Sequence, residues 1–379
     1  MKNYLFVFLY IINTWFSRAQ DVSLRVEVHL SDIIDSTETI FITGSDSAVG
    51  NWNPGRIPLT RINDLLWKFE GSFQKGTRLQ FKITRGSWEK EALYDSATIP
   101  SNFEITLQHD TTMNLKPLTW SDKIKRAKPE LSIRGEVVYH RRVKGKGLKY
   151  SRDLIVWLPP SYRSAVSKKY PVLYLHDGQN IFDPSTSFSG KDWRVDETAD
   201  SLIKAKGMEE IIVVGIYNTP DRLQEYSDTP LGRSYMNFVV HVVKPLIDSV
   251  YRTKPSRRNT AVMGSSLGGL VSMVMAWNYP DVFGKAACLS PSFWYDDEKT
   301  LNEIRAYSGK KKEIKIYLDC GTREKELLDG YTQMVTILKK KGFAEGKDLD
   351  SHIEEKGAHN ESYWSQRVWK PLLFLFGKR

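Results

Sequence analysis

Short apolar runs that alternate with polar residues occupy the first third of the chain. Examples lie at 24–28, 39–43 and 79–83, and Gly, Asn and Asp residues separate them. Because successive side chains of a strand point to opposite faces, this period of two indicates strands with one buried face. We therefore expect a small antiparallel β-sandwich over residues 20–120.

The remainder of the chain has a different period. From residue 135 onward, apolar runs of strand length alternate with segments of helix length, which predicts an α/β domain with a mostly parallel sheet over residues 135–379. The polar, lysine-rich stretch 121–134 between the two patterns is typical of a linker. The strand-like runs are 172–175, 211–216, 261–264 and 314–318.

The first residues fit neither pattern. An apolar run from Tyr4 to Phe16 follows Lys2, and Ser17 and Ala19 put small residues at the positions that a signal peptidase recognises. We expect residues 1–19 to be a signal peptide that is cleaved after Ala19, and hence a secreted or periplasmic protein. The apolar run is shorter than the about 20 residues that a membrane-spanning helix needs.

Composition narrows the classes of function. Of the 379 residues, 41% are hydrophobic and 12% aromatic, which is enough to build real cores. The formal net charge is +10, but the lysine runs 310–312 and 339–341 stand apart from any aromatic stripe. This pattern argues against a nucleic-acid-binding protein and is typical of solvated surfaces, while an anionic substrate stays open.

Two cysteines, Cys288 and Cys320, lie in apolar, strand-like runs. If these strands are neighbours, a single disulfide can join them; the other interpretation is two buried free thiols that act as small hydrophobic side chains. The pair has no C-x-x-C spacing, which argues against a zinc site.

A G-x-S-x-G motif offers a nucleophile. Ser266 lies between Gly264 and Gly268, after the apolar run 261–264 and before a helix-like segment. In a strand-to-helix elbow of this kind the serine hydroxyl is raised from the sheet edge, and the flanking glycines allow the close approach of strand and helix. The same geometry makes the backbone N–H of Leu267 a donor to an oxyanion.

The second oxyanion donor should come from the loop after an earlier strand. The loop that begins after 172–175 contains Gly178, where the glycine lets the backbone N–H of Gly178 or Gln179 turn inward.

A nucleophilic serine also needs a base and an acid. Of the seven histidines, His359 stands in a late glycine-containing loop, as the chain order of an α/β-hydrolase requires, whereas His352 falls within a strand-like run. Glu324 follows the run 314–318 and lies between Ser266 and His359 in sequence, so we favour it as the acid. Asp319, at the end of the same run, is its rival.

Several separated motifs of the second half resemble the putative esterase family of the α/β-hydrolase superfamily, which contains feruloyl and acetyl esterases, siderophore esterases and mycolyltransferases. The resemblance implies an α/β-hydrolase fold with Ser266, Glu324 and His359 as nucleophile, acid and base, and neither a metal nor an organic cofactor. The motifs are His176-Asp-Gly-Gln-Asn180, Asn218-Thr-Pro-Asp-Arg222, Gly264-Ser-Ser-Leu-Gly268, Ser290-Pro-Ser-Phe-Trp294, Gly321-Thr-Arg-Glu324 and Gly357-Ala-His359.

The same resemblance implies a substrate pocket lined by Asp177, Asn218, Arg222 and Trp294. For Arg222 a second interpretation stays open, in which it pairs with Glu225 and only shapes a loop.

The first half resembles a starch-binding type of carbohydrate-binding module through 42–44, 49–54, 81–89 and 120–122. The resemblance implies that Trp52 and Trp88 stack against sugar rings. The alternative is that both are structural aromatics of a small sandwich.

Together these features predict a secreted serine carboxylesterase that forms an acyl-enzyme and acts on acetyl or feruloyl esters of carbohydrate. Two alternatives remain: an esterase for ferric siderophores of the cyclic trilactone type, whose negative charge would suit a basic surface, and a carbohydrate-binding protein or acyltransferase without hydrolytic activity. A glycan bound by the N-terminal domain is a further expected partner.

Overall fold

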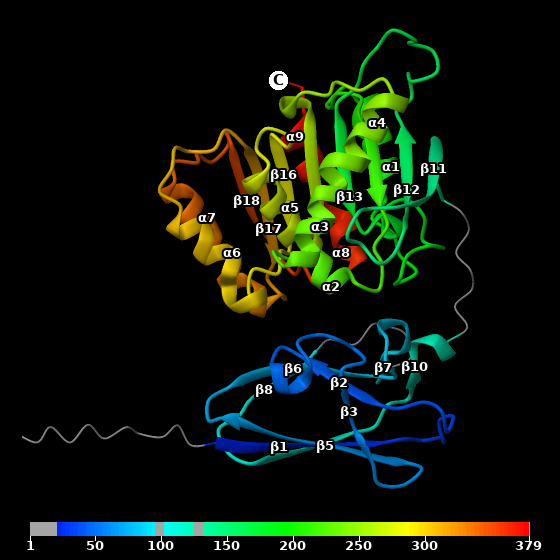
Figure 1. Cartoon of the computed structure of the whole chain (residues 1–379), viewed down its shortest axis with the longest axis vertical. Helices are drawn as coiled ribbons and strands as arrows, with labels where there is room; N and C mark the ends of the chain where they lie inside the picture. The colour runs from blue at the N-terminus through cyan, green and yellow to red at the C-terminus, as the bar shows by residue number, and fades with distance from the viewer. Residues whose placement is uncertain (1–20, 95–101, 125–131, 379) are drawn as a thin grey trace, which may run out of the picture. The chain divides into compact units, whose positions relative to one another are not determined.

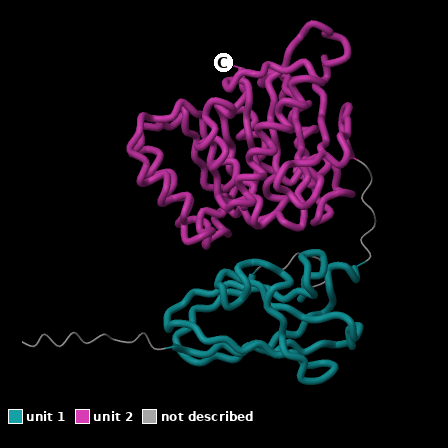
Figure 2. The backbone as a smooth tube through the Cα atoms, in the orientation of Figure 1, with its two compact units in different colours: residues 1–125 teal, residues 126–379 magenta. Residues whose placement is uncertain are grey.

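Residues 21–94, 102–124 and 132–378 are described by the computed structural model. The chain divides into two units, Met1–Lys125 and Arg126–Arg379, which Figure 2 colours separately. The expected signal peptide and part of the expected linker lie outside the described residues. In the part of the chain that is described, the helices are too short or too polar to cross a membrane.

The first unit consists of short strands and single turns of 3-10 helix. Its strands are β1 (Asp21–His29), β2 (Phe41–Gly44), β3 (Ile57–Pro58), β4 (Thr60–Arg61), β5 (Leu66–Gln74), β6 (Arg78–Thr84), β7 (Ala92–Leu93), β8 (Phe103–Thr106), β9 (Thr111–Leu115) and β10 (Thr119–Trp120). Its 3-10 turns are η1 (Ser47–Val49), η2 (Trp88–Lys90) and η3 (Ser121–Lys123).

The first unit is the expected β-sandwich. Its two main sheets have the strand orders β4-β5-β1-β9 and β3-β2-β6-β8, and β10 pairs with β7. Along β1 the apolar side chains from Val22 to Val28 alternate with exposed polar ones, as the period of two predicted. The pairing is not wholly antiparallel, because β9 returns beside β1 in the parallel direction, with Leu24 opposite Thr111.

The second unit alternates strands and helices, as Figure 1 shows. Its strands are β11 (Glu136–Val143), β12 (Arg152–Leu158), β13 (Val172–His176), β14 (Ile212–Ile216), β15 (Thr260–Ser265), β16 (Lys285–Leu289), β17 (Lys315–Gly321) and β18 (Leu349–Glu354). Its helices are α1 (Val195–Lys204), α2 (Arg222–Glu225), α3 (Pro230–Phe238), α4 (Lys244–Val250), α5 (Leu267–Asn278), α6 (Tyr295–Ala306), α7 (Lys325–Lys340), α8 (Glu361–Arg367) and α9 (Trp369–Phe376), with the short turns η4 (Gly178–Asn180), η5 (Val239–Val243) and η6 (Arg257–Asn259).

These strands form one sheet in the order β11-β12-β14-β13-β15-β16-β17-β18. In this sheet order, every pair from β14 through β13 to β18 is parallel. At the other side, β11 pairs with β12 and β12 pairs with β14 in the antiparallel direction. This is the predicted α/β-hydrolase arrangement. Because the carboxyl ends of parallel strands meet at one edge of a sheet, the loops that follow β13 to β18 gather there.

Both faces of this sheet are buried. On β13, Val172 and Tyr174 pack into the core beneath α3, α5 and α7, and Leu173 and Leu175 pack into the core beneath α1, α8 and α9. Such two-sided burial explains why the central strands are uniformly apolar in sequence. Cys288 on β16 and Cys320 on the neighbouring β17 are both buried free thiols, which decides between the two interpretations of the cysteines.

Candidate active site

Ser266 occupies a strained turn between β15 and α5. Its backbone has φ 58° and ψ −125°, a conformation that residues other than glycine rarely adopt. The turn is as tight as the motif predicted, because a Cβ added to Gly264 would lie 2.6 Å from the backbone of Gly268. A strained serine at the carboxyl edge of the sheet is the geometry of a nucleophile elbow.

The hydroxyl of Ser266 is 3.3 Å from the hydroxyl of Ser292. Ser292 also donates its backbone N–H to the carbonyl oxygen of Ser266, at 3.1 Å. Among the described residues, no hydrogen bond joins Ser266 to His359. Catalytic contacts in a ligand-free enzyme are often long and shorten only when substrate binds.

His359 and Glu324 lie together at the same edge. Nδ1 of His359 is 2.8 Å from Oε1 of Glu324, whose side chain is 1% exposed. Burial works against the negative charge of Glu324, but the hydrogen bond from His359 and the charge of Arg367 outweigh it and lower the pKa of Glu324. An ionised carboxylate only accepts hydrogen bonds, so His359 donates from Nδ1 and its Nε2 is left to act as a base.

The second oxygen of Glu324 is anchored from behind. Oε2 accepts the hydroxyl of Ser290 at 2.8 Å and the backbone N–H of Gly321. Nη2 of Arg367 lies 3.7 Å from the same oxygen and donates to the Ser290 hydroxyl at 2.6 Å. The indole of Trp364 also donates to that hydroxyl, at 3.1 Å. One carboxylate oxygen of Glu324 therefore contacts His359, and the other is held by Ser290 and the backbone of Gly321.

Within the described residues, Asp319, the rival acid, makes no hydrogen bond with His359. Its carboxylate accepts from Arg367 at 3.0 and 3.1 Å and from the hydroxyl of Tyr317 at 3.2 Å. His352, the rival base, lies on β18 and pairs with Asp350 at 2.9 Å. Both therefore have other partners, whereas Glu324 and His359 face each other.

The three expected oxyanion donors lie in two turns at this edge. Leu267 is the first residue of α5 and Gly178 the first of η4, and the first N–H groups of a helix have no partner within it. The left-handed turn falls on Asp177, with φ 56°, rather than on Gly178. Glycine is needed at position 178 for another reason: a Cβ there would lie 2.5 Å from the backbone of Gly215 on β14.

Gln179, the third of these residues, is tied to the next loop. Its side-chain oxygen accepts the backbone N–H of Asn218 at 3.2 Å, and its carbonyl oxygen accepts the hydroxyl of Thr186 at 2.6 Å. The loop after β13 is thus held against the loop after β14.

Asp177 is the centre of a polar cluster. It accepts two hydrogen bonds of 2.7 Å from Arg222 and one of 2.6 Å from Asn218. Burial opposes its charge, but Arg222 and Asn218 outweigh this and lower the pKa of Asp177. A Cβ on Gly268 would lie 3.3 Å from Oδ2 of Asp177, which puts this cluster next to the elbow. Three of the four expected pocket residues are therefore in mutual contact.

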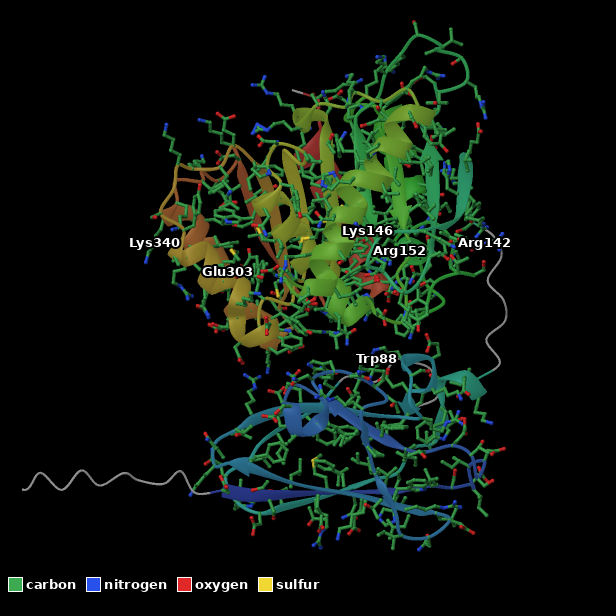
Figure 3. The ribbon with its side chains drawn as sticks, viewed as in Figure 1. Trp88, Arg142, Lys146, Arg152, Glu303 and Lys340 are labelled. Carbon is green, nitrogen blue, oxygen red and sulfur yellow. The ribbon has the colours of Figure 1, made fainter. Side chains whose placement is uncertain are left out.

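Arg222 does not pair with Glu225, so that interpretation was wrong. The partner of Glu225 is Arg152, which donates two hydrogen bonds of 2.9 and 2.7 Å to it, and both side chains are fully buried. Arg152 is labelled in Figure 3. Because a buried ion pair of this geometry is rigid, it fixes the short helix α2 that carries Arg222.

Trp294, the fourth expected pocket residue, comes from the loop after β16. It ends the loop that runs from Ser290 past Ser292, and its ring packs against Tyr295 with centroids 5.7 Å apart. Ser292 contacts Ser266, so Trp294 lies two residues from the neighbour of the nucleophile.

Trp52 and Trp88 lie together on the first unit, where Figure 3 labels Trp88. Their ring centroids are 6.5 Å apart with an interplanar angle of 34°, and both side chains are partly exposed. Two adjacent indoles, tilted relative to each other, form a surface on which the apolar faces of sugar rings can stack.

Sequence reasoning missed the residues that support Glu324. Ser290 stood in a quoted motif without a role, and so did Ser292, which contacts Ser266 instead; their position directly after β16 was the available signal. Arg367 had no comparable signal, because it comes from α8 and reaches Asp319 across 48 positions of sequence.

Comparison with known proteins matches two parts of the chain to two families. The model of the family described as "Putative esterase" matches residues 145–375, and the model described as "Starch binding domain" matches residues 22–115. The second unit thus carries the esterase match and the first unit the starch-binding match.

Three individual proteins illustrate the likeness. The uncharacterized protein YbbA of Bacillus subtilis is 27% identical over 249 residues, which is 60% of this chain and 94% of that protein. The endo-1,4-beta-xylanase/feruloyl esterase of Xylanibacter ruminicola is 28% identical over 58% of this chain but only 29% of its own length. The crystal structure of a ferric enterobactin esterase from Salmonella typhimurium has a TM-score of 0.53 at 16% identity, over 90% of this chain and 91% of that one, and so shows a shared fold.

Proposed function

The chain belongs to the putative esterase family and is a carboxylic ester hydrolase, and we propose that it removes acyl groups from carbohydrate through Ser266, His359 and Glu324. The acyl groups are of the acetyl or feruloyl class. The contact that carries the proposed triad is the 2.8 Å hydrogen bond between His359 and the buried Glu324, at the sheet edge where Ser266 forms its strained elbow.

In the proposed reaction, His359 removes the hydroxyl proton of Ser266 while Oγ of Ser266 attacks the ester carbonyl carbon. The backbone N–H groups of Leu267 and of Gly178 or Gln179 would stabilise the negative oxygen of the tetrahedral intermediate. His359 then protonates the leaving alcohol and later activates water, which releases the acid and restores the serine. Glu324 stabilises the imidazolium form of His359 throughout.

The cluster of Asp177, Asn218 and Arg222 would shape one side of the substrate pocket. Because Arg222 and Asn218 both donate to the carboxylate of Asp177, the cluster is already ordered in the ligand-free protein. Trp294 would contribute an apolar wall from the loop that follows β16.

The starch-binding match supports carbohydrate as the alcohol part of the substrate. A glycan held by Trp52 and Trp88 would raise the local concentration of acyl esters around the catalytic unit. The relative that is named an endo-1,4-beta-xylanase/feruloyl esterase combines, by its name, an activity on a polysaccharide with an esterase activity in one protein.

A siderophore ester is the second candidate substrate. The fold likeness to an enterobactin esterase extends over 90% of this chain, and the net charge of +10 would favour an anionic trilactone. In that case the first unit would serve as a docking or substrate-shaping domain.

Export completes the proposal. The apolar run from Tyr4 to Phe16 and the small residue Ala19 support cleavage of a signal peptide. Amino-terminal sequencing of the protein recovered from cells tests this: a start at Gln20 agrees with it, and a retained Met1 contradicts it.

The experiment that tests the substrate compares kcat/KM on an acetylated or feruloylated oligosaccharide with kcat/KM on a trilactone siderophore, with Ser266→Ala as the blank. A preference for the oligosaccharide supports the proposal. A preference for the trilactone replaces it with the second candidate, and hydrolysis that persists in Ser266→Ala would remove the proposed nucleophile from both.

A further inference from the structure

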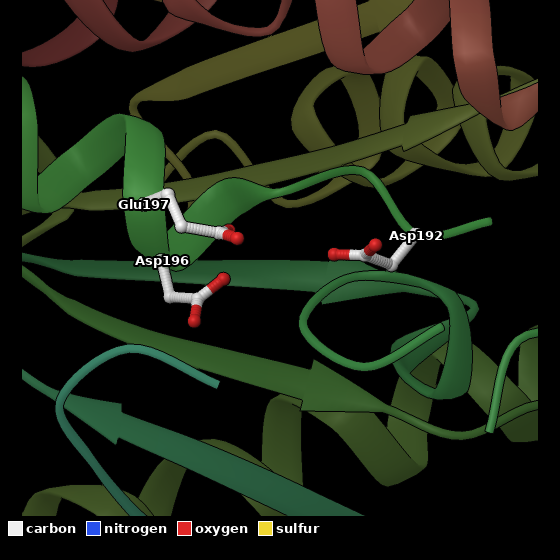
Figure 4. Close-up of side chains that lie close together, drawn as sticks. All are labelled: Asp192, Asp196 and Glu197. Atoms are coloured by element: carbon white, nitrogen blue, oxygen red, sulfur yellow. The ribbon is translucent and has the colours of Figure 1, made fainter. Parts of the chain in front are cut away.

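A second group of acidic side chains lies outside the proposed triad. Asp192 ends the loop before α1, and Asp196 and Glu197 stand in the first turn of that helix. Each offers a carboxylate oxygen, and these oxygens lie within 4.8 Å of one another. Figure 4 shows the carboxyl groups of Asp192 and Glu197 directed toward one another, with that of Asp196 beside them.

The group is buried and incompletely hydrogen-bonded. Asp196 is 0% exposed and Asp192 8%. Oδ2 of Asp196 accepts the backbone N–H of Arg134, but Oδ1 of Asp196 and Oε2 of Glu197 are buried oxygens with no hydrogen-bond partner. Buried polar atoms are nearly always paired, because an unpaired one loses its hydration and gains nothing in return.

In the described ranges, the carboxylates of Asp192 and Asp196 have no cationic side chain as a partner. Within the described residues, no side-chain nitrogen of Lys, Arg or His lies within 4.0 Å of the carboxylate of Asp192 or Asp196. The guanidinium of Arg194 pairs with Glu197 at 3.4 Å and is 62% exposed, and the backbone N–H of Arg194 donates to Oδ2 of Asp192 at 3.0 Å. Ionised together, the three carboxylates therefore require a positive charge that no side chain within 4.0 Å of Asp192 or Asp196 provides in the described part of the chain.

We propose that Asp192, Asp196 and Glu197 bind a hard divalent cation, for which Ca²⁺ is the best fit. The donor set consists of carboxylate oxygens alone, which suits Ca²⁺, Mg²⁺ or Mn²⁺ and disfavours zinc, since neither cysteine nor histidine is present. Ca²⁺ accepts irregular arrangements of oxygen ligands with mixed denticity, whereas Mg²⁺ demands near-octahedral geometry. Water would complete the shell.

The cation would be structural and would act at a distance from ester cleavage. The loop that carries Asp192 is fastened to η4 and its flank: Trp193 donates its N–H to the carbonyl of Asn180 at 2.9 Å, and Val195 donates to that of Ile181 at 3.1 Å. Asp196 is fastened to Arg134, before β11. A bound cation would thus hold this loop to the first turn of α1, and the hydrogen bonds would pass that restraint to Arg134 and to the segment next to the proposed oxyanion donors Gly178 and Gln179.

A proton shared between Asp196 and Glu197 is the competing explanation for their unpaired oxygens. Burial, together with the neighbouring Glu197, raises the pKa of Asp196, so such a proton would be held at neutral pH. A cation and a proton compete for the same oxygens, and only the cation makes stability depend on added metal.

The test uses the full chain, freed of metal with EDTA and kept at about pH 9, above the raised pKa of Asp196, so that proton competition is weak. Calorimetric titration with CaCl₂ should show a single saturable site. Thermal unfolding of the catalytic unit should shift upward by about 5–10 °C when Ca²⁺ exceeds its Kd a hundredfold. The absence of binding heat and of any shift with Ca²⁺, Mg²⁺ or Mn²⁺ would overturn the proposal.

Two variants assign the site. Asp196→Asn should lose the calcium-dependent shift, and Glu197→Gln, at the more exposed side of the cluster, provides the same readout if Asp196→Asn does not fold. The matched control is Asp200→Asn, which lies on the same helix and pairs with Lys204 outside the cluster, and which should keep the shift. A full calcium response in both Asp196→Asn and Glu197→Gln places any bound cation elsewhere. A metal-free Asp196→Asn that is more stable than the metal-free parent, with no calcium response in the parent, identifies the shared proton instead.

Discussion

Nδ1 of His359 lies 2.8 Å from Oε1 of Glu324, and the other oxygen of that carboxylate accepts the hydroxyl of Ser290 at 2.8 Å. Glu324 therefore orients His359 with one carboxylate oxygen, while Ser290 holds the second oxygen in place. Since Glu324 is 1% exposed, water cannot replace either contact. The proposed orientation of the imidazole depends on this single buried carboxylate.

Replacing Glu324 with Gln should reduce kcat by about 10⁴-fold, because the amide can donate to Nδ1 and stabilise the wrong tautomer of His359. KM for a small soluble ester should change little. Steady-state kinetics test this, with Glu326→Gln in the first turn of the same helix as the matched control. Activity of Glu324→Gln close to that of the control would assign the acid to another residue.

Arg367→Met should destabilise the catalytic unit by about 3–5 kcal/mol, because it leaves Asp319 and Glu324 as buried charges without their shared cation. Urea unfolding measures the change. Lys370→Met is the control: its partly exposed pair with Glu354 should contribute less than about 1 kcal/mol. An equal decrease in the free energy of unfolding in the two variants would show that the buried ion pairs of Arg367 contribute no more to stability than the partly exposed pair of Lys370.

The stability difference between the parent and Asp177→Asn should depend on pH. The pKa of Asp177 is lowered in the folded protein, so its ionised form adds stability that is complete above its ordinary value of 3.8. This contribution to stability is lost as the pH falls through the lower pKa that Asp177 has in the folded protein. Urea unfolding between about pH 7 and pH 3 should therefore show a wide difference that narrows in acid. A difference that stays constant with pH would contradict the ion pair with Arg222.

Trp88→Ala should weaken retention on insoluble starch by about tenfold or more, since truncation of a stacking indole removes most of its contact with a sugar ring. Hydrolysis of a small soluble ester should be unaffected. The matched control is Trp369→Ala, which removes a 44% exposed indole from α9 of the catalytic unit. If Trp88→Ala lowers retention and hydrolysis equally, the tryptophan has a structural role.

The elements that sequence predicted best are those set by local pattern. The alternation in β1 and the apolar runs of β13 to β17 follow directly from which faces are buried. Ser266 was visible because the close approach of Gly264 to Gly268 demands glycine at both positions. His359 and Glu324 followed from chain order, since the topology brings the ends of β15, β17 and β18 to one edge.

Contacts between distant segments were beyond that reasoning. Arg222 lies three positions before Glu225, yet the two do not pair. Arg222 pairs with Asp177, which follows β13, and Glu225 pairs with Arg152 on β12. Local spacing favoured the wrong pair because it does not show which side chains a loop turns inward. The same holds for Arg367, whose contact with Asp319 exists only once α8 packs beside β17.

The acylation of Ser266 is the central claim, and labelling with a fluorophosphonate followed by peptide mapping tests it most directly. The account predicts a single adduct on Ser266 that is absent from Ser266→Ala, forms far more slowly in His359→Ala, and forms normally in Ser265→Ala. An adduct on any other serine, or full labelling of Ser266→Ala, would contradict the account.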